Sequence, residues 1–177
     1  AMPWAGCGGE GAITAPTGPS TPPPGAAGPT LKEAGASSGR WVGAAVMSSL
    51  LRSEPLYAET LRREFDYLTA EYEMKWDPIH PGPTTWNYAG ADAIMDFAER
   101  NGMRVKGHTL LWHQALPAWA QELSPPELRI ALEDHIRTLV GRYRGRIVAW
   151  DVVNEAVAEN GIGLRDTVYR QKLGDDY

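Results

Sequence analysis

Apolar and polar positions along the chain change their spacing in blocks from Trp41 onward. Short apolar runs rich in β-branched and aromatic residues predict strands at 41–47, 67–76, 103–112 and 147–153. Apolar residues between these runs recur at helical spacing and predict helices at 53–68, 88–102 and 124–143. Strands that alternate with helices in this way are typical of a parallel α/β sheet.

Capping residues mark the ends of the predicted helices. Ser53 is expected to cap the first helix, with Pro55 in its first turn, and Gly102 is expected to end the second. Ser124 and Glu127 have the spacing of a capping box before the third helix. The clearest helical stripe in the chain follows them: Leu128, Leu132, Ile136, Leu139 and Val140.

The first forty residues have no such period. They hold seven of the fourteen Pro and nine of the nineteen Gly, a composition typical of a disordered linker. We therefore expect a disordered N-terminal segment at 1–40 and a folded domain at 41–177.

Cys7 lies in "WAGCGGE", ahead of the Pro-rich stretch. Small residues before a Cys resemble the lipobox of bacterial lipoproteins, which would make Cys7 the lipidated residue and a membrane anchor. That pattern prefers Leu three residues earlier, where this chain has Trp4. A truncated secretory signal, or a lone Cys in a tail, is the alternative. A lipobox or a secretory signal implies an extracellular, cell-surface or periplasmic protein.

Composition excludes some classes of function. A formal net charge of −5 does not favour nucleic acid as a partner, because phosphate binding relies on clustered Lys and Arg. With one cysteine, the chain cannot form an intramolecular disulfide. The length of 177 residues suits one domain, and no apolar run approaches the length that crosses a bilayer.

Polar residues gather at the carboxyl ends of three predicted strands: Glu71, Glu73 and Lys75, then His108, Trp112 and His113, then Asn154 and Glu155. Ligands bind at this edge in parallel sheets and barrels, so the pattern indicates a site. Glu73 would face the opposite side of its strand from its neighbours, which favours a structural role. The fourth strand is expected to be buried on both faces, and a charge at its end is costly unless it is paired or used in chemistry.

Three motifs, "AEYEMKW", "GHTLLWHQALPAW" and "WDVVNEA", resemble glycoside hydrolase family 10, the retaining endo-1,4-β-xylanases with a (β/α)8 TIM barrel. The resemblance covers 41–177 and implies that Glu155 is the general acid/base. It also implies that Asn154 bonds the 2-hydroxyl of a sugar beside the scissile bond. His108 and Trp112 would line the same subsite, and Glu71 and Lys75 would bind the next sugar. No cofactor and no metal are implied.

Two positions depart from the family pattern. Tyr72 stands where the family usually has Asn after the first Glu, so its ring could stack on a sugar or block it. The family often has Ser or Asn and then Gln after the His that corresponds to His113, whereas this chain has Gln114 and Ala115. The resemblance therefore leaves open the sugar preference on the non-reducing side, at Tyr72, and the contact that Gln114 makes.

Retaining hydrolysis uses two carboxyl groups about 5–5.5 Å apart, and the acid needs a raised pKa. We expect the buried end of the fourth strand to supply the apolar setting that raises the pKa of Glu155. The resemblance places the nucleophile on a later strand. A full barrel needs about 250 residues, whereas 137 follow the linker. We therefore expect about the first four βα units, and no activity from this chain alone.

Alternatives remain for single residues. Glu155 could be an ordinary carboxylate at the edge of the sheet, and Trp112 could serve packing rather than sugar binding. His108 and His113 could be structural imidazoles or zinc ligands, although no third ligand has the spacing of a zinc site. We expect three further Trp to pack within the fold: Trp41, Trp86 and Trp150.

Two classes of function remain at this point. The first is an endo-1,4-β-xylanase that acts on xylan and xylo-oligosaccharides, with a β-1,4-glucanase as the alternative within the same family. The second is a non-catalytic xylan-binding fragment. In either case the open edges of the first and fourth strands predict self-association.

Overall fold

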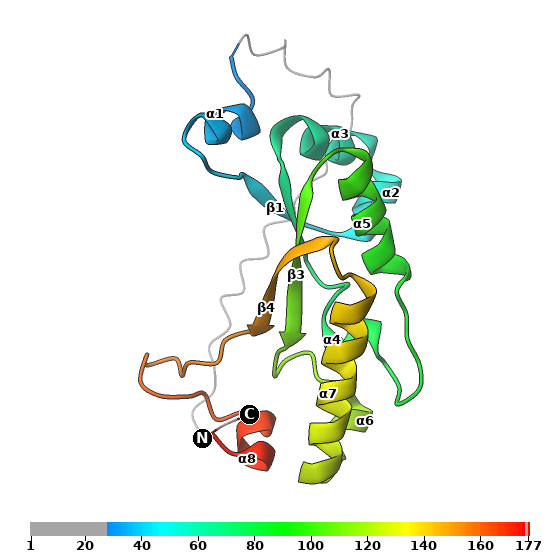
Figure 1. Cartoon of the computed structure of the whole chain (residues 1–177), viewed down its shortest axis with the longest axis vertical. Helices are drawn as coiled ribbons and strands as arrows, with labels where there is room; N and C mark the ends of the chain where they lie inside the picture. The colour runs from blue at the N-terminus through cyan, green and yellow to red at the C-terminus, as the bar shows by residue number, and fades with distance from the viewer. Residues whose placement is uncertain (1–27, 176) are drawn as a thin grey trace, which may run out of the picture.

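The computed structural model describes residues 28–175 and 177 (Figure 1). Its centre is one sheet of four strands in the order β1-β2-β3-β4: β1 Gly43–Val46, β2 Tyr67–Ala70, β3 Arg104–Leu111 and β4 Ile147–Val153. Every neighbouring pair of strands is parallel. This order confirms the predicted parallel α/β sheet.

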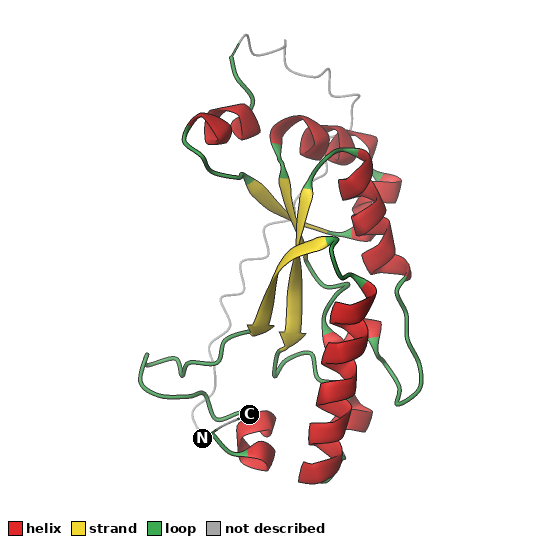
Figure 2. Ribbon diagram, viewed as in Figure 1, coloured by secondary structure: helices red, strands yellow, loops and turns green. Residues whose placement is uncertain are grey.

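Helices connect each strand to the next. The links are α2 Ser48–Ser53 with α3 Pro55–Glu64, α4 Trp76–Ile79 with α5 Ala89–Arg100, and α6 Ala118–Gln121 with α7 Pro125–Arg142. Helix α8, Val168–Leu173, follows β4. Figure 2 shows the longer helices α5 and α7 on the same side of the sheet. Strand, helix and adjacent parallel strand thus repeat as in the βαβ units of an α/β barrel.

Two of the three predicted helix ends are confirmed. Ser124 and Glu127 form the capping box of α7, and Gly102, at φ +65°, follows α5. The prediction that Ser53 caps the first long helix is wrong, because Ser53 is the last residue of α2 and Glu54 precedes α3. Proline disfavours the helical conformation of the residue before it, so the chain breaks at Glu54, and Pro55 begins α3.

Strand β2 ends earlier than its pattern predicts. Residues 71–75 form a turn in which the amide of Lys75 donates to the carbonyl of Tyr72 at 3.0 Å. The Glu73 carboxylate accepts from the amides of Ser48 and Tyr72, which ties this turn to the start of α2. Partial burial raises the pKa of Glu73, but these hydrogen bonds outweigh it and the net pKa is lowered. Glu73 therefore has a structural role.

The apolar sequence of β4 predicted a strand buried on both faces, and that prediction is wrong. Val148 and Val152 are 50% and 53% exposed. One edge of β4 pairs with β3, and no strand among the described residues pairs with the other. Trp150 packs against the core, where a Cβ on Gly107 would collide with its indole. The sheet edge thus leaves apolar side chains open beside a well-packed indole.

A short helix, α1 Leu31–Ser37, lies within the segment predicted to be disordered. Thr30 and Glu33 form its capping box, the Leu31 amide donates to the Glu64 carboxylate at 2.9 Å, and Lys32 Nζ donates to the Arg62 carbonyl at 2.8 Å. The linker prediction is therefore wrong for this helix. No residue of α1 is buried, so its sequence carries no apolar period. Residues 1–27, with Cys7, lie outside the described residues.

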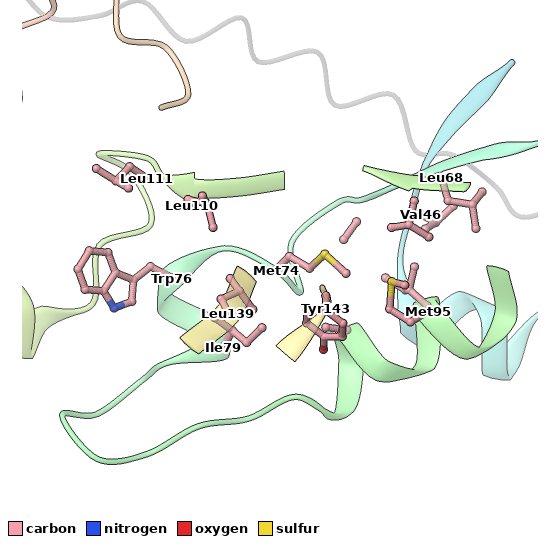
Figure 3. Packing of buried hydrophobic residues seen from close by; sticks show 14 of the residues in the cluster. Val46, Leu68, Met74, Trp76, Ile79, Met95, Leu110, Leu111, Leu139 and Tyr143 are labelled. Carbon is pink, nitrogen blue, oxygen red and sulfur yellow. The ribbon is translucent and has the colours of Figure 1, made fainter. Parts of the chain in front are cut away.

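The core lies between the sheet and the helices (Figure 3). Met74 lies among Val46, Leu68 and Met95 on one side and Trp76 and Ile79 on the other, all buried. Helix α7 buries Leu128, Leu132 and Leu139 of the predicted stripe, and Ile136 and Val140 are partly buried. Within residues 28–175, no helix is both long enough and apolar enough to cross a membrane.

The other two Trp that were expected to pack do so against rings. Trp41 is 56% exposed, yet it stacks on Tyr67 with the ring centroids 5.6 Å apart and has the Arg104 guanidinium 4.4 Å from its ring. Trp86 stacks on His80 with the centroids 3.8 Å apart. Trp41 and Trp86 therefore pack against neighbouring side chains and do not belong to the predicted site.

Candidate active site

The predicted site residues follow three neighbouring strands. Residues 71–75 follow β2, Trp112 and His113 follow β3, and Asn154 and Glu155 follow β4. Because β2, β3 and β4 are adjacent and parallel, their carboxyl ends meet at one edge of the sheet (Figure 1). We call this group of residues the rim.

Glu155 lies at the centre of the rim. Trp112 Nε1 donates to Glu155 Oε2 at 2.9 Å, and His113 Nε2 lies 3.9 Å from the same oxygen. The Glu155 side chain is 41% exposed, so the buried, apolar setting expected for it is wrong in this chain. The physical reason is that β4 is an edge strand and no described element covers the end of it.

The backbone of Glu155 has an uncommon conformation, with φ +54°. A non-glycine residue in the left-handed region costs on the order of 1–3 kcal/mol, and such residues concentrate at functional sites. Two hydrogen bonds hold the segment: Arg165 Nε donates to the Glu155 carbonyl at 2.9 Å, and the Asn154 amide donates to the Leu111 carbonyl at 2.8 Å. The carboxylate is therefore aimed by its backbone as well as by Trp112.

Lys75 joins the group from the β2 side. It is only 9% exposed, and its Nζ lies 4.3 Å from the Trp112 ring centroid and 5.6 Å from that of Tyr72, which are cation–π distances. The Tyr72 hydroxyl donates to Asp77 Oδ2 at 2.7 Å, and this hydrogen bond, with burial and the Asp77 charge, raises the pKa of Tyr72. Tyr72 is thus tied by its hydroxyl, with 45% of the residue exposed.

His108 lies one step deeper, beside Asp151. Its Nδ1 is 2.9 Å from Asp151 Oδ2, and Lys106 Nζ is 2.8 Å from the same oxygen. Partial burial raises the pKa of Asp151, but the hydrogen bonds and charges of Lys106 and His108 outweigh it, so the pKa is lowered. Strand alternation puts Lys106, His108 and Asp151 on the opposite face of the sheet from Trp150. In a barrel, the face that holds these three residues is the interior side.

Lys106 and Asp151 were not among the predicted site residues. The sequence did contain a signal: Lys106 and His108 are two residues apart on one predicted strand, so they share a face. The motif "WDVVNEA" on the next strand contains a carboxylate, Asp151, that could face them. His108 and Asp151 are partners in the β3–β4 register, which no pattern in a single strand reveals.

The structure brings some predicted residues together and leaves others apart. Trp112 contacts Lys75 through its ring and Glu155 through its indole N–H, and His113 Nε2 lies 3.9 Å from Glu155. The side chains of Glu71 and Asn154 lie at the same edge but make no hydrogen bond or ion pair within the described part of the chain. Within residues 28–175, no group of three His, Cys, Asp or Glu side chains is arranged to hold a metal ion.

Trp112 belongs to the rim rather than to the core. Its indole N–H is occupied by Glu155, and its ring carries the Lys75 ammonium. The first contact orients the Glu155 carboxylate, and the second keeps the Trp112 ring beside Lys75 at the site. Chemically, the rim offers a carboxyl group that can exchange a proton, held by an indole and an imidazole.

Comparisons with known proteins agree with this geometry. Residues 30–177 match the family model described as glycosyl hydrolase family 10. The chain is 46% identical over 123 residues to endo-1,4-beta-xylanase B of Thermotoga neapolitana, covering 68% of this chain and 35% of that protein. It is 40% identical over 143 residues to endo-1,4-beta-xylanase B of Paenibacillus barcinonensis, covering 77% of this chain and 42% of that protein.

Solved structures show the same relationship. Xylanase 10B from Thermotoga petrophila RKU-1, in complex with xylobiose, is 39% identical with a TM-score of 0.80, over 87% of this chain and 48% of that one. Native xylanase 10B from Thermotoga maritima is 41% identical with a TM-score of 0.77, over 84% and 47%. The chain thus spans less than half the length of these relatives. With its parallel sheet of four βα units, it belongs to glycoside hydrolase family 10 and has the fold of about half of a (β/α)8 barrel.

Proposed function

We propose that this chain carries the acid/base part of a retaining endo-1,4-β-xylanase, with Glu155 as the general acid/base. The observation that carries the proposal is the Glu155 carboxylate held at the sheet edge by Trp112 at 2.9 Å, in a chain of this family. Xylan and xylo-oligosaccharides are the proposed substrates. Support comes from relatives that are endo-1,4-beta-xylanases and from one that was solved with xylobiose.

The proposed chemistry assigns Glu155 two steps. As a carboxylic acid it protonates the glycosidic oxygen while the bond to the leaving sugar breaks. As a carboxylate it then removes a proton from the water that releases the bound glycosyl group. The indole N–H of Trp112 fixes one carboxylate oxygen, and partial exposure of the side chain leaves the group within reach of a long substrate.

Neighbouring residues are assigned to sugar binding. Asn154 would bond the 2-hydroxyl beside the scissile bond, and His108 and Trp112 would line the same subsite. Lys75 and Glu71 would bind the next sugar. Tyr72, tied to Asp77, presents a ring next to Lys75 at that subsite, where it would stack on the sugar or limit its approach.

The nucleophile is proposed to lie outside this chain, on a later strand of the barrel. Asp151 is the carboxylate on the interior side of β4, but its Oδ2 accepts from both Lys106 and His108. These contacts assign Asp151 to orienting His108. With the nucleophile proposed to lie on a later strand, we expect the 177-residue chain to lack hydrolytic activity by itself.

The test of Glu155 uses the chain joined to the remaining strands of a family 10 barrel. Glu155→Ala should lower kcat/KM on xylan by about 10²–10⁴-fold, because the departing sugar needs a proton. Dinitrophenyl xylobioside should keep its rate of glycosyl-enzyme formation, because its leaving group needs none. Equal losses on both substrates would show that Glu155 is not the acid.

A non-catalytic xylan-binding role is the second proposal, and the rim as described supports it because Lys75 and Trp112 can hold a sugar without a nucleophile. A β-1,4-glucanase is the alternative in the enzyme class. Binding and hydrolysis of xylohexaose and cellohexaose, measured side by side on the joined protein, separate the three. Cleavage of xylohexaose alone supports the first proposal.

Location and anchoring are proposed from the sequence near Cys7. A lipidated Cys7, or a secretory leader, would place the protein at the bacterial surface, in the periplasm or outside the cell.

Self-association through the open edges of β1 and β4 is also proposed, and the half-exposed Val148 and Val152 support it.

A further inference from the structure

A hairpin follows Glu155, in the long segment that joins β4 to α8 (Figure 1). We call residues 156–165 the hairpin. Val157 and Leu164 form an antiparallel bridge across it. Because a chain that reverses in this way returns to its starting point, Arg165 at the end of the hairpin lies beside Glu155.

Arg165 holds the backbone on the carboxyl side of Glu155. Its Nε donates to the Glu155 carbonyl at 2.9 Å, and its amide donates to the Ala156 carbonyl at 2.7 Å. Its Nη2 lies 2.8 Å from Glu159 Oε1, and the Arg165 side chain is 20% exposed. A charged donor makes a stronger hydrogen bond than a neutral one. One residue therefore fixes two consecutive peptide units directly after Glu155.

The direction of the Glu155 carboxylate depends on this backbone. Glu155 has φ +54°, a conformation that a non-glycine residue keeps only where neighbouring contacts impose it. On its amino side, the Asn154 amide donates to the Leu111 carbonyl at 2.8 Å. On its carboxyl side, the contacts are those of Arg165. Because the backbone on both sides sets the direction of the Cα–Cβ bond, loss of Arg165 should let the side chain turn away from Trp112.

A general acid depends on such placement. It must lie within hydrogen-bond reach of the oxygen that it protonates, and a misplacement of about 1 Å can cost about 10²-fold in rate. Trp112 holds one carboxylate oxygen of Glu155 from the end of β3, and Arg165 holds the backbone of Glu155 from the hairpin. The carboxylate is thus held at its tip and at its base by two separate parts of the chain.

The remaining contacts of the hairpin separate this role from a purely structural one. Glu159 is 85% exposed, and an ion pair at such a position contributes little stability. The hairpin also has another anchor, because Arg170 Nη1 on α8 donates to the Leu164 carbonyl at 2.9 Å. The hairpin should therefore persist without the Arg165 guanidinium, and the contact that matters is the one with the Glu155 carbonyl.

We propose that Arg165 is a positioning residue for the acid/base, which fixes the backbone of Glu155 so that its carboxyl group meets the glycosidic oxygen. This inference rests on the proposed role of Glu155. Arg165 itself neither touches the sugar nor transfers a proton. Its removal should therefore weaken the steps that use the Glu155 proton and spare a step that does not.

The test compares Arg165→Met with the parent in the chain joined to the remaining strands of a family 10 barrel. Met keeps an unbranched apolar stem and has no donor. We expect kcat/KM on xylan to fall about tenfold, whereas glycosyl-enzyme formation from dinitrophenyl xylobioside should change by less than about twofold. Added to Glu155→Ala, Arg165→Met should cause no further loss on xylan, because both changes remove the same contribution. The matched control, Glu159→Ala, should change either rate by less than about twofold.

A second measurement uses the 177-residue chain and does not depend on catalysis. The indole N–H signal of Trp112 in a nuclear magnetic resonance spectrum reports its hydrogen bond to Glu155. Arg165→Met should move this signal upfield and leave that of Trp86, which stacks on His80, in place. Arg165→Lys keeps the charge without the planar fork, so it should give smaller changes in the same direction, and it replaces Arg165→Met if that variant does not fold.

Three outcomes would overturn the proposal. The first is an equal loss on xylan and on dinitrophenyl xylobioside in the Arg165 variants. The second is a double variant in which the two losses multiply, because Arg165 would then act independently of Glu155. The third is an unchanged Trp112 signal. If Glu155→Ala itself lowers both rates equally while the Trp112 signal still moves in Arg165→Met, the acid assignment fails and the placement of Glu155 by Arg165 stands.

Discussion

Two buried or partly buried histidines show how differently this chain treats the same side chain. His108, on β3 just below the rim, has the Asp151 carboxylate 2.9 Å away and Lys106 bonded to the same oxygen. His135, on α7, is fully buried and stacks on Trp76 with centroids 4.4 Å apart. His108 thus has charged partners, whereas burial lowers the pKa of His135 and keeps its imidazole neutral.

The difference separates function from stability. Glu155 and Trp112 are partly exposed and bonded to each other, so changing either should alter chemistry more than folding. The helix layer holds the core and the cluster of Trp76, His80 and His135, so changes there should alter folding first.

Removing a buried side chain from α7 should have the largest effect on the stability of the fold. Leu139 is fully buried, and Leu139→Ala should lower the free energy of unfolding by about 2–5 kcal/mol through lost burial and a cavity. Ile130→Ala on the exposed side of the same helix should change it by about 0.5 kcal/mol or less. Urea unfolding followed by circular dichroism measures both. Similar losses would mean that α7 does not pack as described.

Acid should act on the helix layer at milder pH than on the rim. Burial first, and then repulsion from His80, lower the pKa of His135 to about 3 from 6.5, against the opposite effect of the Leu110 carbonyl. Because the unfolded chain binds a proton at His135 that the folded chain refuses, stability is full above pH 6.5 and falls toward pH 3. The loss amounts to about 2 kcal/mol at pH 5.

His135→Phe should remove that loss, since the ring can stay stacked on Trp76 but no longer titrates. Urea unfolding at pH 7 and pH 5 measures the change, and the variant should lose less stability than the parent between these values. Asp151 should not contribute in this window, because a lowered carboxylate pKa costs stability only at lower pH. A variant that loses as much as the parent would contradict the role of His135.

A smaller effect is expected from one hydrogen bond at the rim. In the completed barrel, Trp112→Phe keeps a ring under Lys75 but removes the N–H donor to Glu155. We expect kcat/KM on xylo-oligosaccharides to fall about tenfold, equivalent to about 1.4 kcal/mol, with the unfolding midpoint unchanged. Unchanged kinetics would mean that Trp112 acts through its ring face alone.

Much of the fold could be predicted, and the failures have physical causes. Helix α7 was predictable because its buried stripe and capping box agree. The short helices α1, α2, α4, α6 and α8 were not, since four to seven residues are too few to show a period. Strand β2 was predicted too long because the polar residues 71–75 alternate as a strand does, although their hydrogen bonds form a turn.

The site was predictable in its members and less so in its environment. Residues at the ends of neighbouring parallel strands do meet, and Lys75, Trp112 and Glu155 lie together. The exposure of Glu155 was not foreseen, because burial depends on which strands lie beside β4. The Asp151 pairing was missed because the register between β3 and β4 decides it.

Hydrolysis of xylohexaose by this chain, alone and mixed with a separately produced C-terminal half of a family 10 relative, tests the central claim most directly. That claim is that these residues hold the acid/base and that the nucleophile lies elsewhere. We predict no hydrolysis above background alone, measurable hydrolysis in the mixture, and none in the mixture with Glu155→Ala. Robust hydrolysis by the chain alone that Glu155→Ala abolishes would contradict the account.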